Sequence, residues 1–105
     1  MKSIYSFSVG AFMLATASGW PAIAQTQDAA VVRAMAATCA NCHGTDGRSV
    51  GTVPSLAGAD KGSIVQQMQD FKAGKRPATV MHQLAKGYTD EQIDQLATYF
   101  AAQKK

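Results

Sequence analysis

The chain has 105 residues, with 10 lysine or arginine residues against 7 aspartate or glutamate residues and a formal net charge of +3 at pH 7. This length predicts one small domain, and so mild a positive charge excludes the strongly basic surface of a typical nucleic-acid-binding protein. The sequence has only 2 cysteines, too few for the disulfide framework that stabilises many small secreted proteins.

Residues 1–24 have the pattern of an export signal. Lys2 gives a short positive start, residues 4–17 form an apolar run, and residues 22–24 form an A-x-A cleavage site. The apolar run is shorter than the roughly 20 residues that span a bilayer, which disfavours a membrane anchor. We therefore expect cleavage of the signal, a periplasmic location, and a mature domain of residues 25–105 without stable membrane insertion.

The first helix is predicted over residues 29–38, where an alanine-rich run follows Asp28, a residue type that often caps helices. This helix runs directly into the motif at residues 39–43. Helical spacing places four apolar residues on the side expected to face the core: Val31, Val32, Met35 and Ala36.

Residues 39–43 read Cys-Ala-Asn-Cys-His, the spacing by which a polypeptide attaches a c-type haem. On one helical turn, Cys39 and Cys42 can each form a thioether with one vinyl group of a porphyrin, and His43 then ligates the iron. A closed zinc site needs four protein ligands, and beyond these three the chain offers only the distant His82. A thioredoxin-type dithiol would need alternating strands and helices, and the sequence shows no convincing strand. We therefore predict one covalently bound haem c.

Glycines and Pro54 interrupt the helical pattern after the motif, so residues 44–59 are predicted to form an irregular loop that lies against the ligand. The second helix is expected to begin at Asp60 or Ser63 and to end at Gly74. Its apolar positions follow the helical spacing and comprise Ile64, Val65, Met68 and Phe71.

Two further helices are predicted toward the C-terminus. A short helical turn is expected around residues 82–86, closing at Gly87. The last helix begins after Thr89, with Gln92 placed for a capping box, and its buried stripe is expected to contain Ile93, Leu96, Ala97 and Phe100. The elements together predict an all-α domain of helices and loops wrapped around one haem. Because so small a core gives little net stability, the apoprotein is expected to be poorly folded.

The second axial position of the iron decides the function, since an occupied position favours electron transfer and an open one binds gases or peroxide. Met35 is too close to Cys39 on the same helix to reach the opposite face of the haem, and Met68 falls in an apolar stripe. Met81 lies in a loop, and its thioether raises the potential of the iron relative to a second imidazole. His82 and a vacant position are the alternatives to Met81.

Four segments of the sequence resemble the small class I bacterial cytochromes c, and they comprise residues 54–58, 71–76, 79–81 and 85–92. Within that class the sequence is most similar to the haem subunits of flavocytochrome c sulfide dehydrogenases. The resemblance implies that Met81 is the sixth ligand. It also implies that the carbonyl group of Pro54 accepts a hydrogen bond from His43, which would orient the ring. Many relatives of this subgroup carry two haem domains, whereas this sequence has one CxxCH motif.

With protein ligands on both faces of the haem, the chain is expected to be a single-electron carrier without catalytic residues. Its expected donor is a periplasmic dehydrogenase, with a flavoprotein sulfide dehydrogenase as the candidate, and its expected acceptor is a cytochrome or terminal oxidase. The alternative function is a haem-based gas sensor or peroxidase-like enzyme with an open or labile sixth position. Five cations are expected around the haem edge, where they either steer an acidic partner or form an ordinary solvated surface: Lys61, Lys72, Lys75, Arg76 and Lys86.

Overall fold

The computed structural model describes residues 29–105, so the predicted export signal and the Asp28 cap lie outside the described residues. Within this range the chain forms four α-helices and one short 3-10 turn, with no strand. They are α1 (Ala29–His43), the 3-10 turn η1 (Thr45–Gly47), α2 (Lys61–Lys72), α3 (Met81–Ala85) and α4 (Asp90–Ala101). The predicted all-α class is confirmed. Among residues 29–105, none of the helices combines the length and the apolar character needed to cross a bilayer.

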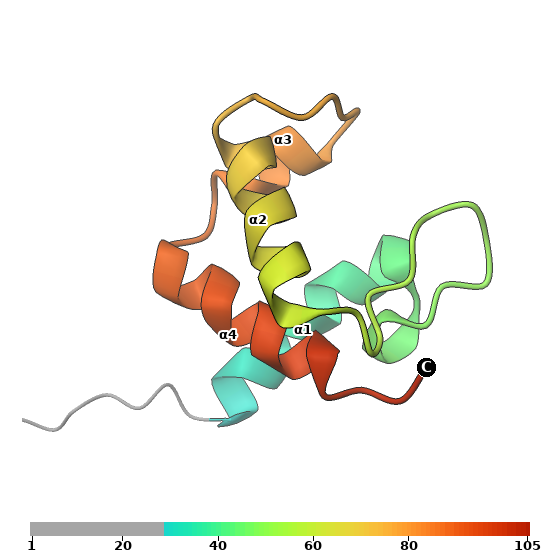
Figure 1. Ribbon diagram of the computed structural model, residues 1–105. Helices are drawn as coiled ribbons and strands as arrows, with labels where there is room; N and C mark the ends of the chain where they lie inside the picture. The colour runs from blue at the N-terminus through green and yellow to red at the C-terminus, as the bar shows by residue number, and fades with distance from the viewer. Residues whose placement is uncertain (1–28) are drawn as a thin grey trace, which may run out of the picture.

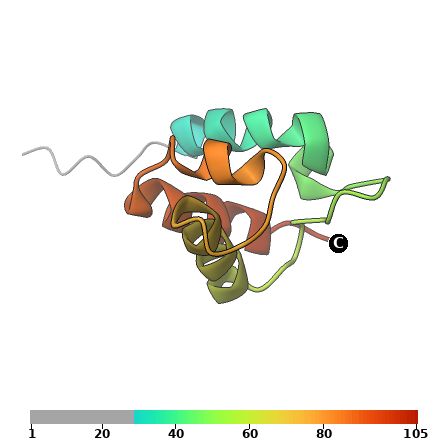
Figure 2. The same ribbon diagram turned by 90° about the horizontal axis from the view of Figure 1, so that it is seen from above.

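The helices pack around α4 and α2 (Figure 1). α4 contacts both α1 and α2, and α2 also contacts α3. Figure 1 shows that α1 and α4 cross, and the view from above places α1 on one side of α4 (Figure 2). The core cluster joins one residue of α1, one of α2 and three of α4, namely Ala36, Ile64, Leu96, Ala97 and Phe100. Small alanine side chains therefore form part of the contact between α1 and α4, the contact that positions the end of α1.

α1 is a single helix that continues without a break through the CxxCH motif. Ala36 is buried and Met35 packs against the core, as predicted, but Val31 is 46% exposed. The prediction for Val31 was wrong because Val31 and Ala36 lie about 140° apart around a helix of 100° per residue, and α1 contacts α4 through a narrower face.

α2 begins and ends through local hydrogen bonds. The side chain of Asp60 accepts a hydrogen bond of 2.8 Å from the backbone N–H of Ser63, which selects Asp60 as the N-cap. At the other end, Gly74 adopts a left-handed φ of 71°. There the N–H of Gly74 donates to the carbonyl of Phe71 and the N–H of Lys75 donates to that of Asp70. This is the Schellman arrangement, so the prediction that α2 ends at Gly74 is confirmed.

α3 begins one residue earlier than predicted, and Met81 lies at its first position rather than in a loop. The physical reason is that the carbonyl of Val80 accepts hydrogen bonds from the N–H groups of Gln83 and Leu84, which closes the first turn around Met81. The N–H of Gly87 donates to the carbonyl of Leu84 at 3.0 Å and closes the turn as predicted.

α4 agrees with the sequence prediction in both its cap and its buried face. The side chain of Thr89 accepts from the N–H of Gln92 at 3.2 Å, and the Gln92 side chain accepts from the N–H of Thr89 at 2.9 Å. This is a complete capping box. All four residues of the predicted stripe are buried: Ile93, Leu96, Ala97 and Phe100.

The loop over residues 44–59 is attached to the C-terminal end of α4. The Tyr99 hydroxyl donates to Asp46 at 2.7 Å, which raises the pKa of Tyr99. The N–H of Gly58 donates to the carbonyl of Phe100 at 2.9 Å, and the Arg48 Nε donates to that of Lys104 at 2.8 Å. The loop and α4 therefore form one connected unit beside the end of α1.

Gly47 provides a test of this loop. We expect Gly47→Ala to lower the free energy of unfolding by about 1–3 kcal/mol, because Gly47 has a φ of 79° and an added Cβ would lie 2.9 Å from the Phe100 ring. Urea unfolding of the haem-loaded protein measures the change. Gly51→Ala is the matched control in the same loop, since nothing lies within 4 Å of its added Cβ. Its stability should change by less than about 0.5 kcal/mol. Equal effects of the two variants would contradict the close packing of Gly47.

Candidate functional site

The three residues of the CxxCH motif that can bind a haem, Cys39, Cys42 and His43, lie at the C-terminal end of α1. Both cysteines are free, Cys39 partly buried and Cys42 exposed. Burial raises the pKa of the Cys39 thiol, and a hydrogen bond with Thr38 opposes this shift. Cys39 packs against the core while Cys42 faces outward. One turn of one helix therefore presents two thiols at the boundary between the core and solvent.

His43 makes one short hydrogen bond, in which its Nδ1 lies 2.6 Å from the carbonyl oxygen of Pro54. A carbonyl oxygen can only accept, so Nδ1 must carry the proton. The neutral ring then has its lone pair on Nε2, the nitrogen left to ligate a metal. This is the pair of groups that the resemblance implies, and it determines both the tautomer and the orientation of the imidazole.

The donor set at the end of α1 fits a c-type haem. Cys39 and Cys42 supply two unpaired sulfurs on one turn, and His43 supplies an imidazole nitrogen with a free lone pair. Within residues 29–105 there is no group of three or more His, Cys, Asp or Glu side chains that could hold a metal ion. The residues present therefore suit a porphyrin that is attached through sulfur and ligated through nitrogen.

Met81 and His82 come from another element, α3. Met81 is partly buried. His82 is also partly buried, and its Nδ1 is buried without a hydrogen-bond partner. The protein therefore encloses part of the His82 ring.

The structure contains a polar network beside the motif that the sequence did not predict. The hydroxyl groups of Thr38 and Tyr88 lie 3.1 Å apart, and the Lys72 Nζ donates to the carbonyl of Tyr88 at 2.8 Å and to Asp90 at 3.0 Å. Hydrogen bonds from Gln69 and Lys72 hold the pKa of the Asp90 carboxyl below its ordinary value. Thr38 and Tyr88 are 50 positions apart, so no local sequence pattern signals their contact.

The five cations predicted around the haem edge divide into two groups. Lys61 pairs with Asp94 at 2.8 Å and Lys72 pairs with Asp90 at 3.0 Å, so the charges of these two lysines are compensated locally. The remaining three have no ion pair within residues 29–105: Lys75, Arg76 and Lys86. No acidic residue occurs in residues 71–89, so the charge of this second group is not neutralised locally.

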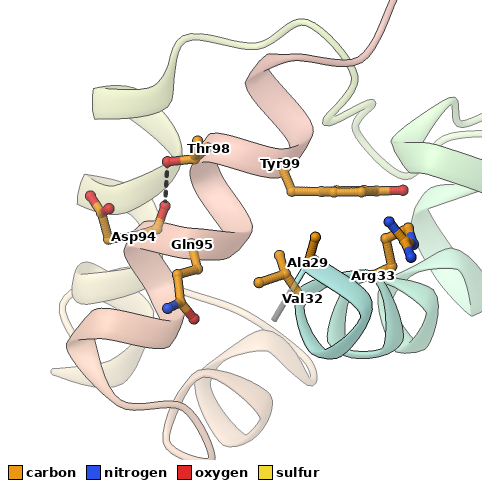
Figure 3. A pocket seen from close by; sticks show the side chains of 7 residues that line it. All are labelled: Ala29, Val32, Arg33, Asp94, Gln95, Thr98 and Tyr99. Carbon is orange, nitrogen blue, oxygen red and sulfur yellow. Dashed lines mark hydrogen bonds between the residues drawn. The ribbon is translucent and has the colours of Figure 1, made fainter. Parts of the chain in front are cut away.

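Two cavities lie away from the predicted site residues. The first, of about 380 Å³, lies between α1 and α4 (Figure 3), where the ring of Tyr99 extends toward Arg33. The second, of about 430 Å³, lies between the 44–59 loop and the C-terminus. None of the five residues predicted to hold the haem lines either cavity: Cys39, Cys42, His43, Pro54 and Met81.

Comparisons with known proteins support the haem interpretation. The family model described as "Cytochrome c" matches residues 29–104. The chain is 49% identical over 63 residues to the cytochrome subunit of sulfide dehydrogenase from Chlorobaculum tepidum, covering 60% of this chain and 57% of that protein. It is 42% identical over 78 residues to cytochrome c4 from Pseudomonas aeruginosa, covering 73% of this chain and 39% of that protein. The chain thus spans between 39% and 57% of the length of these relatives.

A solved structure agrees with these matches. The structure of cytochrome c4 from Acidithiobacillus ferrooxidans is similar with a TM-score of 0.59 and 42% sequence identity. The similarity covers 61% of this chain and 38% of that chain.

The small size of the core generates a prediction about haem attachment. We expect the double variant Cys39→Ala, Cys42→Ala to lose most of the helical far-UV circular dichroism signal, because five core residues, two of them alanines, bury little apolar surface. The exposed substitution Val31→Ala, on the same helix, should leave the spectrum of the haem-loaded protein unchanged. A native helical signal in the double variant would show that the fold does not depend on the cofactor.

Proposed function

The chain belongs to the cytochrome c family, and we propose that it acts as a periplasmic single-electron shuttle with His43 and Met81 as the axial ligands of its haem c. Membership confirms the predicted fold, the covalently bound haem c and the role in electron transport. The periplasmic location is supported by the export-signal pattern of residues 1–24.

In this proposal the end of α1 holds the cofactor. Cys39 and Cys42 would form the thioethers, and His43 would ligate through Nε2, while its Nδ1–H donates to the Pro54 carbonyl. When bound, the haem iron supplies reversible one-electron oxidation and reduction. His43 cannot rotate without breaking a hydrogen bond of 2.6 Å, so its geometry is expected to be the same in both oxidation states. The short hydrogen bond is the observation that carries the proposal.

Packing favours Met81 over the other methionines as the second axial ligand. Residues 29–105 contain three methionines, and two of them, Met35 and Met68, pack against the hydrophobic core. Met81 is not part of that cluster and lies, partly buried, at the start of α3, after an irregular segment. Its thioether is a soft ligand that favours the reduced iron.

Carbon monoxide tests this ligation. The reduced unmodified protein should show almost no spectral change with carbon monoxide, because both axial positions are filled by protein. Met81→Ala should bind carbon monoxide readily, lower the midpoint potential, and lose the charge-transfer band at the red end of the oxidised spectrum.

His82→Ala is the matched control from the adjacent position, and it should retain the band and the resistance to carbon monoxide. If the unmodified protein binds carbon monoxide at once, the alternative of a gas sensor or peroxidase-like enzyme is favoured. The buried, unpaired Nδ1 of His82 would then be the candidate acid or base.

We further propose a flavoprotein sulfide dehydrogenase as the electron donor and a cytochrome or terminal oxidase as the acceptor. The donor is suggested by the 49% identity to a protein named as the cytochrome subunit of sulfide dehydrogenase. Docking would use the surface around α3, where Val80 and Leu84 are each about half exposed. Three cations without ion pairs accompany them on this segment: Lys75, Arg76 and Lys86. An apolar centre with a positive rim fits a partner surface with a complementary negative rim.

The charge of this surface predicts a dependence on salt. Reduction of the oxidised protein by reduced flavin mononucleotide, which is anionic, should slow severalfold as ionic strength rises from roughly 0.01 to 0.15 M. The rate of reduction by lumiflavin, which is neutral, should not change with ionic strength. The triple variant Lys75→Gln, Arg76→Gln, Lys86→Gln, which neutralises the segment, should abolish most of the salt effect. Lys104→Gln serves as a single-charge control outside the segment. If the rate of reduction by flavin mononucleotide does not depend on salt, electrostatic steering is contradicted.

A further inference from the structure

Lys72, the last residue of α2, makes two hydrogen bonds to the chain between α3 and the start of α4. Its Nζ donates to the backbone carbonyl of Tyr88 at 2.8 Å and to the Asp90 carboxylate at 3.0 Å. The Lys72 side chain is 31% exposed, against 45% for Lys61, which also pairs with a carboxylate of α4. Lys72 is therefore placed to hold the backbone between α3 and α4.

Tyr88 joins the hydrogen bond from Lys72 to contacts with α3 and α1. Its N–H donates to the carbonyl of Ala85, the last residue of α3, at 3.3 Å. Its hydroxyl lies 3.1 Å from that of Thr38, the residue before Cys39, and its ring packs against the core. One residue thus connects α3 to the helix that carries the CxxCH motif, and Lys72 holds its carbonyl.

α3 needs such an attachment because it is short. A helix of five residues is far below the length at which helices are stable alone, so packing and end contacts must hold it in place. α2 supplies both: it packs against α3 directly and, through Lys72, it holds the turn in which α3 ends. Any displacement of that turn would move Met81.

We infer that Lys72 is a positioning residue for the sixth axial ligand: by binding the carbonyl of Tyr88 it fixes α3 and with it the place of Met81. The inference rests on the proposed ligation by Met81. It assigns to Lys72 a role inside the domain in place of the partner-steering role expected from its charge.

The test is carbon monoxide binding to the reduced, full-length, haem-loaded Lys72→Met variant, in which the donor is lost and the aliphatic chain is retained. We expect its affinity for carbon monoxide to rise about tenfold or more, since hydrogen bonds from a charged donor contribute more than neutral ones. The red-end band of the oxidised protein should weaken at a temperature where far-UV circular dichroism still shows native helix content. Lys72→Arg, which retains a cationic donor, should restore most of the resistance to carbon monoxide.

Lys61→Met is the matched control. It removes an ion pair of 2.8 Å between α2 and α4 but does not touch the turn after α3, so carbon monoxide affinity should stay near that of the unmodified protein. Asp90→Asn, which removes the ion pair of Lys72 and leaves its bond to Tyr88, should also have a small effect. If Lys72→Met folds poorly, Lys72→Leu, which also lacks a donor, provides the same readout.

Equal carbon monoxide affinities for Lys72→Met and Lys61→Met would overturn the inference. Lys72 would then only stabilise the fold through an ion pair, as Lys61 does. Failure of the ligation itself gives a different result. In that case the unmodified protein binds carbon monoxide and Met81→Ala changes nothing, so the two failures are distinguishable.

Discussion

The hydrogen bond between His43 and Pro54 joins the last residue of α1 to a loop residue 11 positions later. Helix geometry alone fixes the two sulfurs of the motif relative to each other, but it leaves the imidazole free to turn about its side-chain bonds. The Pro54 carbonyl removes that freedom and selects the tautomer. An imidazole held in this way would need little rearrangement when the charge of a bound iron changes, which suits electron transfer.

That hydrogen bond requires the loop to be held in place, and α4 provides this. The Tyr99 hydroxyl and the Phe100 carbonyl, on one end of α4, both bond to the 44–59 loop. The other end of α4 starts at a capping box next to the turn that Lys72 holds. α4 therefore supports the segments on both sides of the proposed haem site while contributing no ligand of its own.

Sequence reasoning predicted the fold well where the signals are local. The capping box at Thr89 and the Schellman end at Gly74 depend on residues a few positions apart, so both could be read directly. The CxxCH residues were predicted for the same reason. Pro54 came only from the resemblance, because its contact with His43 crosses a loop. The role inferred for Lys72 had no signal at all, since its partners belong to elements whose relative placement is set by packing.

The attachments between the loop and α4 have a consequence for local opening of the native state. The Gly47 carbonyl accepts the N–H groups of both Leu56 and Ala57, and Gly58 donates to Phe100. These amides are shielded only while the C-terminal helix stays docked, so they should exchange with solvent deuterium as one cooperative unit. Fraying of the C-terminus would then release the proximal side of the iron site first, while the α2–α3 side stays protected.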